Sequence, residues 1–174
     1  LWYRRQRQMC IRDSITHSIG GVLIQHAKEH LLHINLSEKQ KMFYFTTCGW
    51  MMWNWLVGSL FCKSSIVLYE GSPFYPNPEH LWKIAEKSKV SIFGTSAKYI
   101  DALSKSNVVP KKHFTLSNLR TICSTGSPLS PDSYDYILNN IKSDVQIASI
   151  SGGTDLLGCF VLCNPLCPVV KGEI

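Results

Sequence analysis

The chain has 174 residues, a length typical of one domain or of a large part of one. Hydrophobic residues make up 45% and charged residues 17% of the sequence, which excludes a disordered or collagen-like chain. No apolar run reaches the ~18 residues that a membrane helix requires, because polar and glycine residues such as Gly58, Ser59 and Lys63 interrupt it. We therefore expect a soluble α/β protein without a membrane partner.

The net charge of +6 is concentrated at the start of the chain. Four of the five arginines precede position 13, and Arg120 is the fifth, whereas the rest of the chain relies on lysine. This abrupt change predicts that residues 1–14 are a non-native leader and that the native pattern begins at Ile15. The leader lacks the apolar stretch of a secretory signal. The alternative is a basic arm that binds phosphates, and a nucleic-acid partner, which we do not expect, would depend on that arm alone.

Seven cysteines carry little information in their spacing. Cys159, Cys163 and Cys167 recur every four residues, but Pro165 and Pro168 oppose the regular helix that would gather them, and the sequence has no CxxC pair. We therefore do not expect a zinc site. Free thiols without a signal peptide favour a reducing, cytoplasmic location.

From Ile15 onward the sequence alternates helix-like and strand-like segments. The first is a helix over 20–33, in which Leu23, Ala27 and Leu31 share one face while Lys28 and Glu29 are expected to turn away. In chain order there follow a strand over 42–45, a helix over 50–62, a strand over 66–69, a helix over 78–88, a strand over 90–93, a helix over 96–104, a strand over 120–124, a helix over 131–141 and a strand over 145–149. The spacing of about 25 residues and the all-apolar strands predict an α/β fold with a layered, mostly parallel sheet and flanking helices.

Three of these strands lead into unusual segments. TTCGWMMWNW follows the first strand, TGSPLS follows the fourth and ISGGTDLLG follows the fifth. Singly each is ordinary, since glycine and serine are common in loops and tryptophan with methionine is typical of a core. Ligands in parallel sheets bind at the carboxyl ends of strands, so the three segments together indicate a ligand site.

Five segments, in their order along the chain, resemble the adenylate-forming acyl-CoA synthetase superfamily, and in particular its acetoacetate-activating members. They are HSIGGVLIQHAKEHLLH, FYFTTCGWMMWNWLVGSL, IVLYEGSPF, STGSPLSP and SISGGTD. The resemblance covers residues 15–174 and implies part of the large N-terminal, AMP-binding domain. It also implies a two-step reaction in which acetoacetate and ATP give an acyl-adenylate, and coenzyme A then displaces AMP, with Mg²⁺ as the metal cofactor.

The resemblance assigns roles to two of the loops. Thr125, Gly126, Ser127 and Pro128 match the adenine-side loop, although relatives often carry glutamate where this chain has Ser127.

The second loop runs from Ser151 through Gly152 and Gly153 to Thr154 and Asp155, and it matches the superfamily's phosphate-contacting loop. Thr154 is then expected to contact the α-phosphate of ATP, and Asp155, the only metal ligand that we assign, to hold Mg²⁺ through a hard oxygen.

The acyl pocket is expected at the first segment. Gly49 and Trp50 match a Gly-Trp pair there, with Met51 beside them. Acetate-activating relatives carry a tryptophan where this chain aligns Gly152, so its absence favours a longer acid such as acetoacetate.

Other parts of the superfamily pattern are not found in this sequence. A phosphate loop ending in Pro-Lys is expected immediately before Ile15 to Ser18, where the chain reads MCIRDS, and the ribose-binding aspartate and adenylation lysine belong downstream of Ile174. We therefore expect an internal, catalytically inactive piece of such an enzyme. Two alternatives stay open: a synthetase for another short- or medium-chain acid, and a non-catalytic adenylate-binding module.

Overall fold

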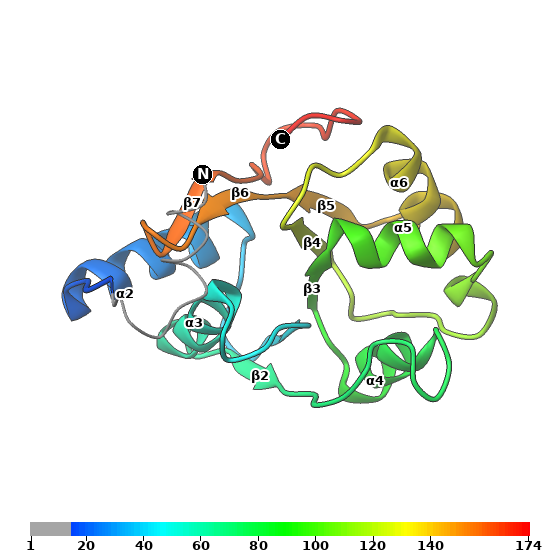
Figure 1. Ribbon diagram of the computed structural model, residues 1–174, viewed down its shortest axis with the longest axis horizontal. Helices are drawn as coiled ribbons and strands as arrows, with labels where there is room; N and C mark the ends of the chain where they lie inside the picture. Colours follow the sequence, from blue (N-terminus) through cyan, green and yellow to red (C-terminus); the bar gives the residue numbers. More distant parts are fainter. Residues whose placement is uncertain (1–14) are drawn as a thin grey trace.

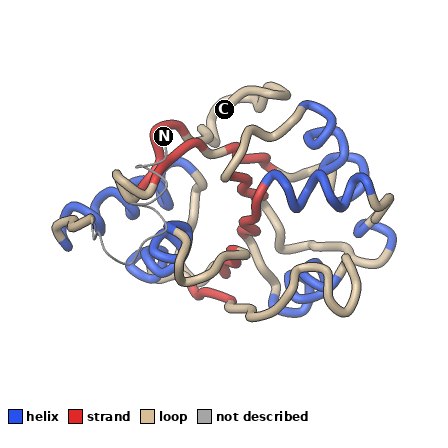
Figure 2. Tube along the Cα trace, in the orientation of Figure 1, coloured by secondary structure: helices blue, strands red, loops and turns tan. Residues whose placement is uncertain are grey.

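The computed structural model of the chain describes residues 15–174, so the expected leader lies outside the described residues. Its centre is a parallel sheet in the order β2-β1-β3-β4-β5, which runs through the middle of the molecule in Figure 2. The strands are β1 (Lys41–Tyr44), β2 (Ser65–Val67), β3 (Ile92–Ser96), β4 (Thr121–Thr125) and β5 (Gln146–Ser149). The helices are α2 (Ile19–Lys28) with a π turn (Glu29–His33), α3 (Met51–Gly58) with a 3-10 turn (Ser59–Cys62), α4 (His80–Ser88), α5 (Ala97–Lys105), a 3-10 turn (Pro110–Lys112) and α6 (Pro131–Tyr136) with a π turn (Ile137–Ile141). The α/β class, the parallel sheet and its flanking helices are confirmed.

Helices cover both faces of this sheet. In Figure 1, α4, α5 and α6 lie on one side of the strands, and α2 and α3 lie on the other. Alternate side chains of a strand point to opposite faces. Phe43 and Phe93 accordingly join the core under α4, α5 and α6, whereas Met42, Tyr44 and Ile92 join the core under α3. The sheet therefore separates two apolar cores.

The helix that begins the described chain differs from the prediction. Glu29, expected to face solvent, is 1% exposed, whereas Leu31, expected to be buried, is 47% exposed. The reason is that Glu29 and the neighbouring His26 and His30 find hydrogen-bond partners inside the protein, which makes their burial possible.

The segment after β5 is a second difference. ISGGTDLLG was expected to be a loop, but it contains an antiparallel pair, β6 (Ser151–Gly153) and β7 (Gly158–Val161), joined by a four-residue turn. A smaller difference concerns α4, which begins at His80 rather than at residue 78.

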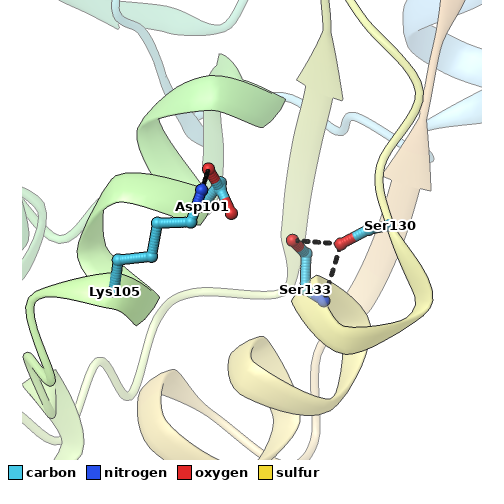
Figure 3. Close-up of polar contacts among 4 residues, drawn as sticks. All are labelled: Asp101, Lys105, Ser130 and Ser133. Atoms are coloured by element: carbon cyan, nitrogen blue, oxygen red, sulfur yellow. Dashed lines mark hydrogen bonds and ion pairs between the residues drawn. The ribbon is translucent and has the colours of Figure 1, made fainter.

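Serine side chains begin several of the helices. Ser130 precedes α6, and its Oγ accepts a hydrogen bond from the backbone N–H of Ser133 at 3.3 Å while the two hydroxyls lie 2.9 Å apart (Figure 3). The same view shows the ion pair between Asp101 and Lys105 on α5, one helical turn apart, at 2.7 Å. Such capping satisfies backbone N–H donors at the start of a helix. Ser130 therefore fixes the point at which the loop after β4 ends and α6 begins.

Phe93 lies in the core under α4, α5 and α6, and its removal tests whether that core stabilises the fold. Its ring lies 4.3 Å from that of Trp82 and 5.1 Å from that of Phe43 (centroid distances), and it is fully buried. Phe93→Ala should lower the free energy of unfolding by about 3–5 kcal/mol, because it leaves a cavity. Phe160→Ala removes the same side chain at a 69% exposed position and should change stability by less than about 0.5 kcal/mol. Urea unfolding followed by circular dichroism compares them, and equal effects would contradict the described core.

Candidate active site

The carboxyl ends of the strands meet at one edge of the sheet. Register pairs Ser96 of β3 with Thr125 of β4, and Ser124 of β4 with Ser149 of β5. The Thr125 hydroxyl, which is buried, donates a hydrogen bond to the Ile150 carbonyl at 2.8 Å. The loops after β4 and β5 therefore leave the sheet side by side and are tied to each other.

A cavity of about 220 Å³ lies between these two loops. It is lined by residues of both predicted nucleotide loops together with the end of the described chain: Thr125, Gly126, Ser127, Pro128, Ser149, Ile150, Ser151, Gly152 and Ile174. Pockets for drug-sized ligands span ~300–1,000 Å³, so this cavity has room for part of a nucleotide. Ser149 and Ile150 lie in the SISGGTD segment but were given no role of their own from the sequence, and no sequence signal indicates that Ile174 lines the cavity.

Gly126 connects this cavity to the predicted acyl segment. Its φ of +89° lies in the left-handed region, which favours glycine, and a Cβ at this position would lie 3.8 Å from the Trp50 indole. Trp50 also packs edge-on against Tyr44, with ring centroids 6.0 Å apart. The structure thus brings the predicted acyl residue Trp50 beside the predicted adenine loop.

The two other predicted acyl residues of this segment lie differently. Gly49 is exposed in the turn that precedes α3, whereas Met51 is 7% exposed and belongs to the core under that helix. Their proximity to an acyl group stays a prediction.

The predicted phosphate loop, residues 151–155, lies partly in a strand and partly in a turn of the β6–β7 hairpin. Ser151, Gly152 and Gly153 form β6, while Thr154 and Asp155 begin the turn to β7 and are not among the residues that line the 220 Å³ cavity. Thr154 is half-buried and Asp155 is exposed.

Gly152 has a close backbone neighbour. A Cβ at Gly152 would lie 2.4 Å from the carbonyl oxygen of Gly158 and 3.1 Å from the Cα of Cys159. These atoms belong to the β7 backbone and cannot rotate away as a side chain would. A tryptophan at position 152 would therefore require β7 to move, so a Gly152→Trp substitution would change the hairpin as well as the space for an acyl group.

The described residues could hold Mg²⁺ only together with a bound nucleotide. Residues 15–174 contain no group of three or more His, Cys, Asp or Glu side chains that could hold a metal ion by themselves. Mg²⁺ commonly takes one or two protein carboxylates and completes its shell with water and substrate phosphates. Asp155 fits that role when the ion arrives with a nucleotide. Within the same residues, no helix is both long and apolar enough to cross a membrane.

The cysteines beneath the site are packing residues. Burial raises the pKa of the Cys163 thiol to about 11 and raises that of Cys159 further, with the nearby Glu29 adding to the shift at Cys159. Both thiols therefore stay protonated at neutral pH, and a protonated thiol is a poor nucleophile.

A mostly buried polar face of α2 and its π turn contacts the β6–β7 hairpin, and the hydrophobic pattern of the sequence did not predict it. His26, Glu29, His30 and His33 follow the i, i+3, i+4, i+7 spacing of one helix face, which is the signal that could have found them. The Nε2–H of His30 donates to the Trp55 carbonyl at 2.8 Å, and the ring is fully buried. The pKa of His30 is lowered to about 3, mainly by burial; the hydrogen bond to Trp55 opposes this shift and neighbouring His26 adds to it.

The chain is similar in sequence to known proteins. No family model matches the chain. An acetoacetyl-coenzyme A synthetase of Rhizobium meliloti (strain 1021) is 54% identical over 160 residues, which are 92% of this chain and 25% of that protein. The acetoacetyl-CoA synthetase of Gallus gallus is 50% identical over 92% of this chain and 24% of its own length. The chain spans about a quarter of the length of the curated relatives it matches.

A solved structure of the same kind of enzyme has a similar fold. The acetoacetyl-CoA synthetase from Streptomyces lividans superposes with a TM-score of 0.87 at 42% identity, over 92% of this chain and 25% of that one. The chain is thus homologous to acyl-CoA synthetases, which are ligases. Within that class these homologues are acetoacetyl-CoA synthetases, and the chain corresponds to about a quarter of such an enzyme.

His30 makes stability depend on pH. Its pKa is about 3 in the folded protein and 6.5 in the unfolded chain, so between these values the unfolded state binds more protons and acid favours unfolding. The free energy of unfolding should fall by about 2–3 kcal/mol between pH 7 and pH 4.5 from this residue. His30→Gln should remove most of that fall. Urea titrations of both proteins at the two pH values test this, and equal pH dependence in the variant and the wild type would contradict the assignment.

Proposed function

We propose that residues 15–174 form part of the AMP-binding domain of an acetoacetate–CoA ligase, and that the edge of the sheet described above binds its nucleotide and acyl group. The observation that carries this proposal is the cavity shared by the loops 125–128 and 149–152, in a chain 54% identical to an acetoacetyl-coenzyme A synthetase. Acetoacetate, ATP and coenzyme A are the small molecules proposed, and the free cysteines of the described region agree with a reducing, cytoplasmic setting.

The proposed chemistry assigns each loop a task. The loop with Gly126 and Pro128 holds the adenine side, where the glycine allows the purine face to approach the backbone. The Thr154 hydroxyl donates to an α-phosphate oxygen, and Asp155 holds the Mg²⁺ that neutralises phosphate charge. Donors and cations aimed at charge that develops in the transition state stabilise it most, so these two residues are the catalytic ones.

Acyl selectivity is the finer part of the proposal. We place the acyl group in the cavity beside Trp50 and the backbone of Gly152; the side-chain direction of Gly152 itself is filled by β7. Acetate leaves about two carbon positions unburied there, which at ~0.8 kcal/mol per methylene-sized group is worth about 10–20-fold in kcat/KM. Preference for a different acid is the alternative that the same measurement detects.

The first test grafts the chain into a complete relative. A chimera in which residues 15–174 replace the matching 160 residues of the Rhizobium meliloti protein should catalyse acetoacetate-dependent ATP–pyrophosphate exchange, with acetate about 10–20-fold less efficient. The 174-residue chain alone should show no exchange above a boiled control, because it spans only a quarter of its relatives. A folded chimera that is inactive with every short acid, or an active isolated chain, would overturn the proposal.

The second test addresses Asp155 in that chimera. Asp155→Ala should lower the exchange rate by about 10²–10³-fold and weaken its dependence on Mg²⁺, since a group that stabilises developing charge is lost. Asp155→Glu should retain part of the rate. Asp132→Ala, an exposed aspartate in the first turn of α6, is the control and should leave the rate unchanged. Unaltered kinetics in Asp155→Ala would remove this residue from the site.

A further inference from the structure

We propose that Glu29 is a positioning residue that holds the β6–β7 hairpin, and with it the Thr154–Asp155 turn, in the geometry that the reaction uses. This inference rests on the proposed function for the role of the turn. The mechanical part, that one carboxylate fixes the hairpin, rests on contacts within the described residues alone.

Glu29 is a carboxylate with three donors from three parts of the chain. Its Oε1 accepts from the backbone N–H of Cys159 in β7 at 2.8 Å and from Nε2 of Gln25 at 2.6 Å. Its Oε2 accepts from the indole Nε1 of Trp55 in α3 at 2.7 Å. At 1% exposure this carboxylate depends on those hydrogen bonds, and the Trp55 indole N–H and the Cys159 backbone N–H would be buried without a partner if the carboxylate were removed.

Two histidines on the same helix face hold the hairpin on either side of that contact. The Nε2 of His26 lies 2.8 Å from the Leu157 carbonyl oxygen, and the Nδ1 of His33 lies 3.0 Å from the Cys163 carbonyl oxygen. A carbonyl only accepts, so the ring nitrogen donates in both cases. Residues 26, 29 and 33 therefore hold backbone atoms before, within and after β7.

Glycine permits this close approach. A Cβ at Gly158 would lie 3.0 Å from Oε1 of Glu29 and 3.0 Å from Nε2 of Gln25, so a side chain at position 158 would require both groups to shift by a few tenths of an ångström. A Cβ at Gly58 would lie 2.3 Å from Nδ1 of His26. Two glycines thus make room for Glu29 and His26, two of the three side chains that hold the hairpin, which indicates a built contact rather than incidental packing.

The hairpin carries this constraint to the turn over a short distance. Gly153 pairs with Gly158 across the strands, and the N–H of Leu157 donates to the Thr154 carbonyl at 3.2 Å. Only residues 154–157 lie between the paired strands. A displacement of β7 therefore moves Thr154 and Asp155, and a shift of about 1 Å in a reacting group can cost on the order of 10²-fold in rate.

One arm of the test uses the chain itself. Hydrogen exchange should show that Glu29→Ala loses protection locally, over 153–161, while amides of β3 and β4 keep theirs. Glu29→Gln retains an acceptor and should lose less. Glu38→Ala removes an exposed glutamate that pairs with Lys63 at 2.8 Å and should change neither region. Unchanged protection over 153–161, or an equal loss throughout the sheet, would overturn the positioning role.

The other arm uses the chimera. Glu29→Ala should lower kcat of ATP–pyrophosphate exchange by about 10–100-fold while KM for ATP changes less than about threefold, because the turn is misplaced and the adenine loop is not. Glu29→Gln should recover part of the rate. If Glu29→Ala does not fold there, Gly158→Ala, which crowds the carboxylate without removing it, should lower kcat in the same direction by a smaller factor, about 3–10-fold. A folded variant with wild-type kcat overturns the proposal. An inactive parent chimera counts against the proposed function alone. The hydrogen-exchange measurement on the 174-residue chain then decides on the role of Glu29.

Discussion

Burial of both faces of the central sheet is the constraint on which the site depends, because it leaves each strand one possible register. A slip of one residue would exchange Phe43 with Met42 between the two cores, and would do the same to Phe93 and Ile92. With the register fixed, the carboxyl ends of β3, β4 and β5 lie level. The loops that follow β4 and β5 then meet around one cavity, and the hydrogen bond from the Thr125 hydroxyl to the Ile150 carbonyl joins them.

Beyond the edge of the sheet the means of positioning changes. The β6–β7 hairpin has a half-exposed, glycine-rich first strand, and Cys159 is the one residue of its two strands that joins the buried core. Its place is set instead by hydrogen bonds from the side chains of Glu29, His26 and His33 to its backbone. Hydrogen bonds are directional where apolar contacts are not, so this support suits a segment that must present two particular side chains.

The sequence predicted most of the sheet and part of the site. All five parallel strands were expected close to their observed bounds, since an apolar run between helix-like segments is typical of a strand buried on both faces. The two loops of the cavity were expected for the same reason, because they directly follow such strands. The resemblance to acyl-CoA synthetases then added roles that no spacing provides.

What the sequence did not predict has a common physical cause. Hydrophobic periodicity treats burial as a property of apolar residues, so it placed Leu31 inside and Glu29 outside, whereas polar partners reversed them. The strand β6 reads SGG, with no side chain that favours a strand, and its pairing depends on β7. The close contact of Gly152 with Gly158 is likewise a property of the paired backbone.

The connectivity of the sheet has a consequence for how the chain folds. Every pairing in the parallel sheet joins distant residues, as Lys41 with Ser65 or Met42 with Ile92, so each requires a long loop to close before any contact repays the lost entropy. The hairpin is the opposite case, since Gly153 pairs with Gly158 almost next to it in sequence. Local pairs form within microseconds, but this one is held by side chains from a helix more than a hundred residues earlier. The segment that can form first by itself therefore reaches its final place only when α2 docks against it.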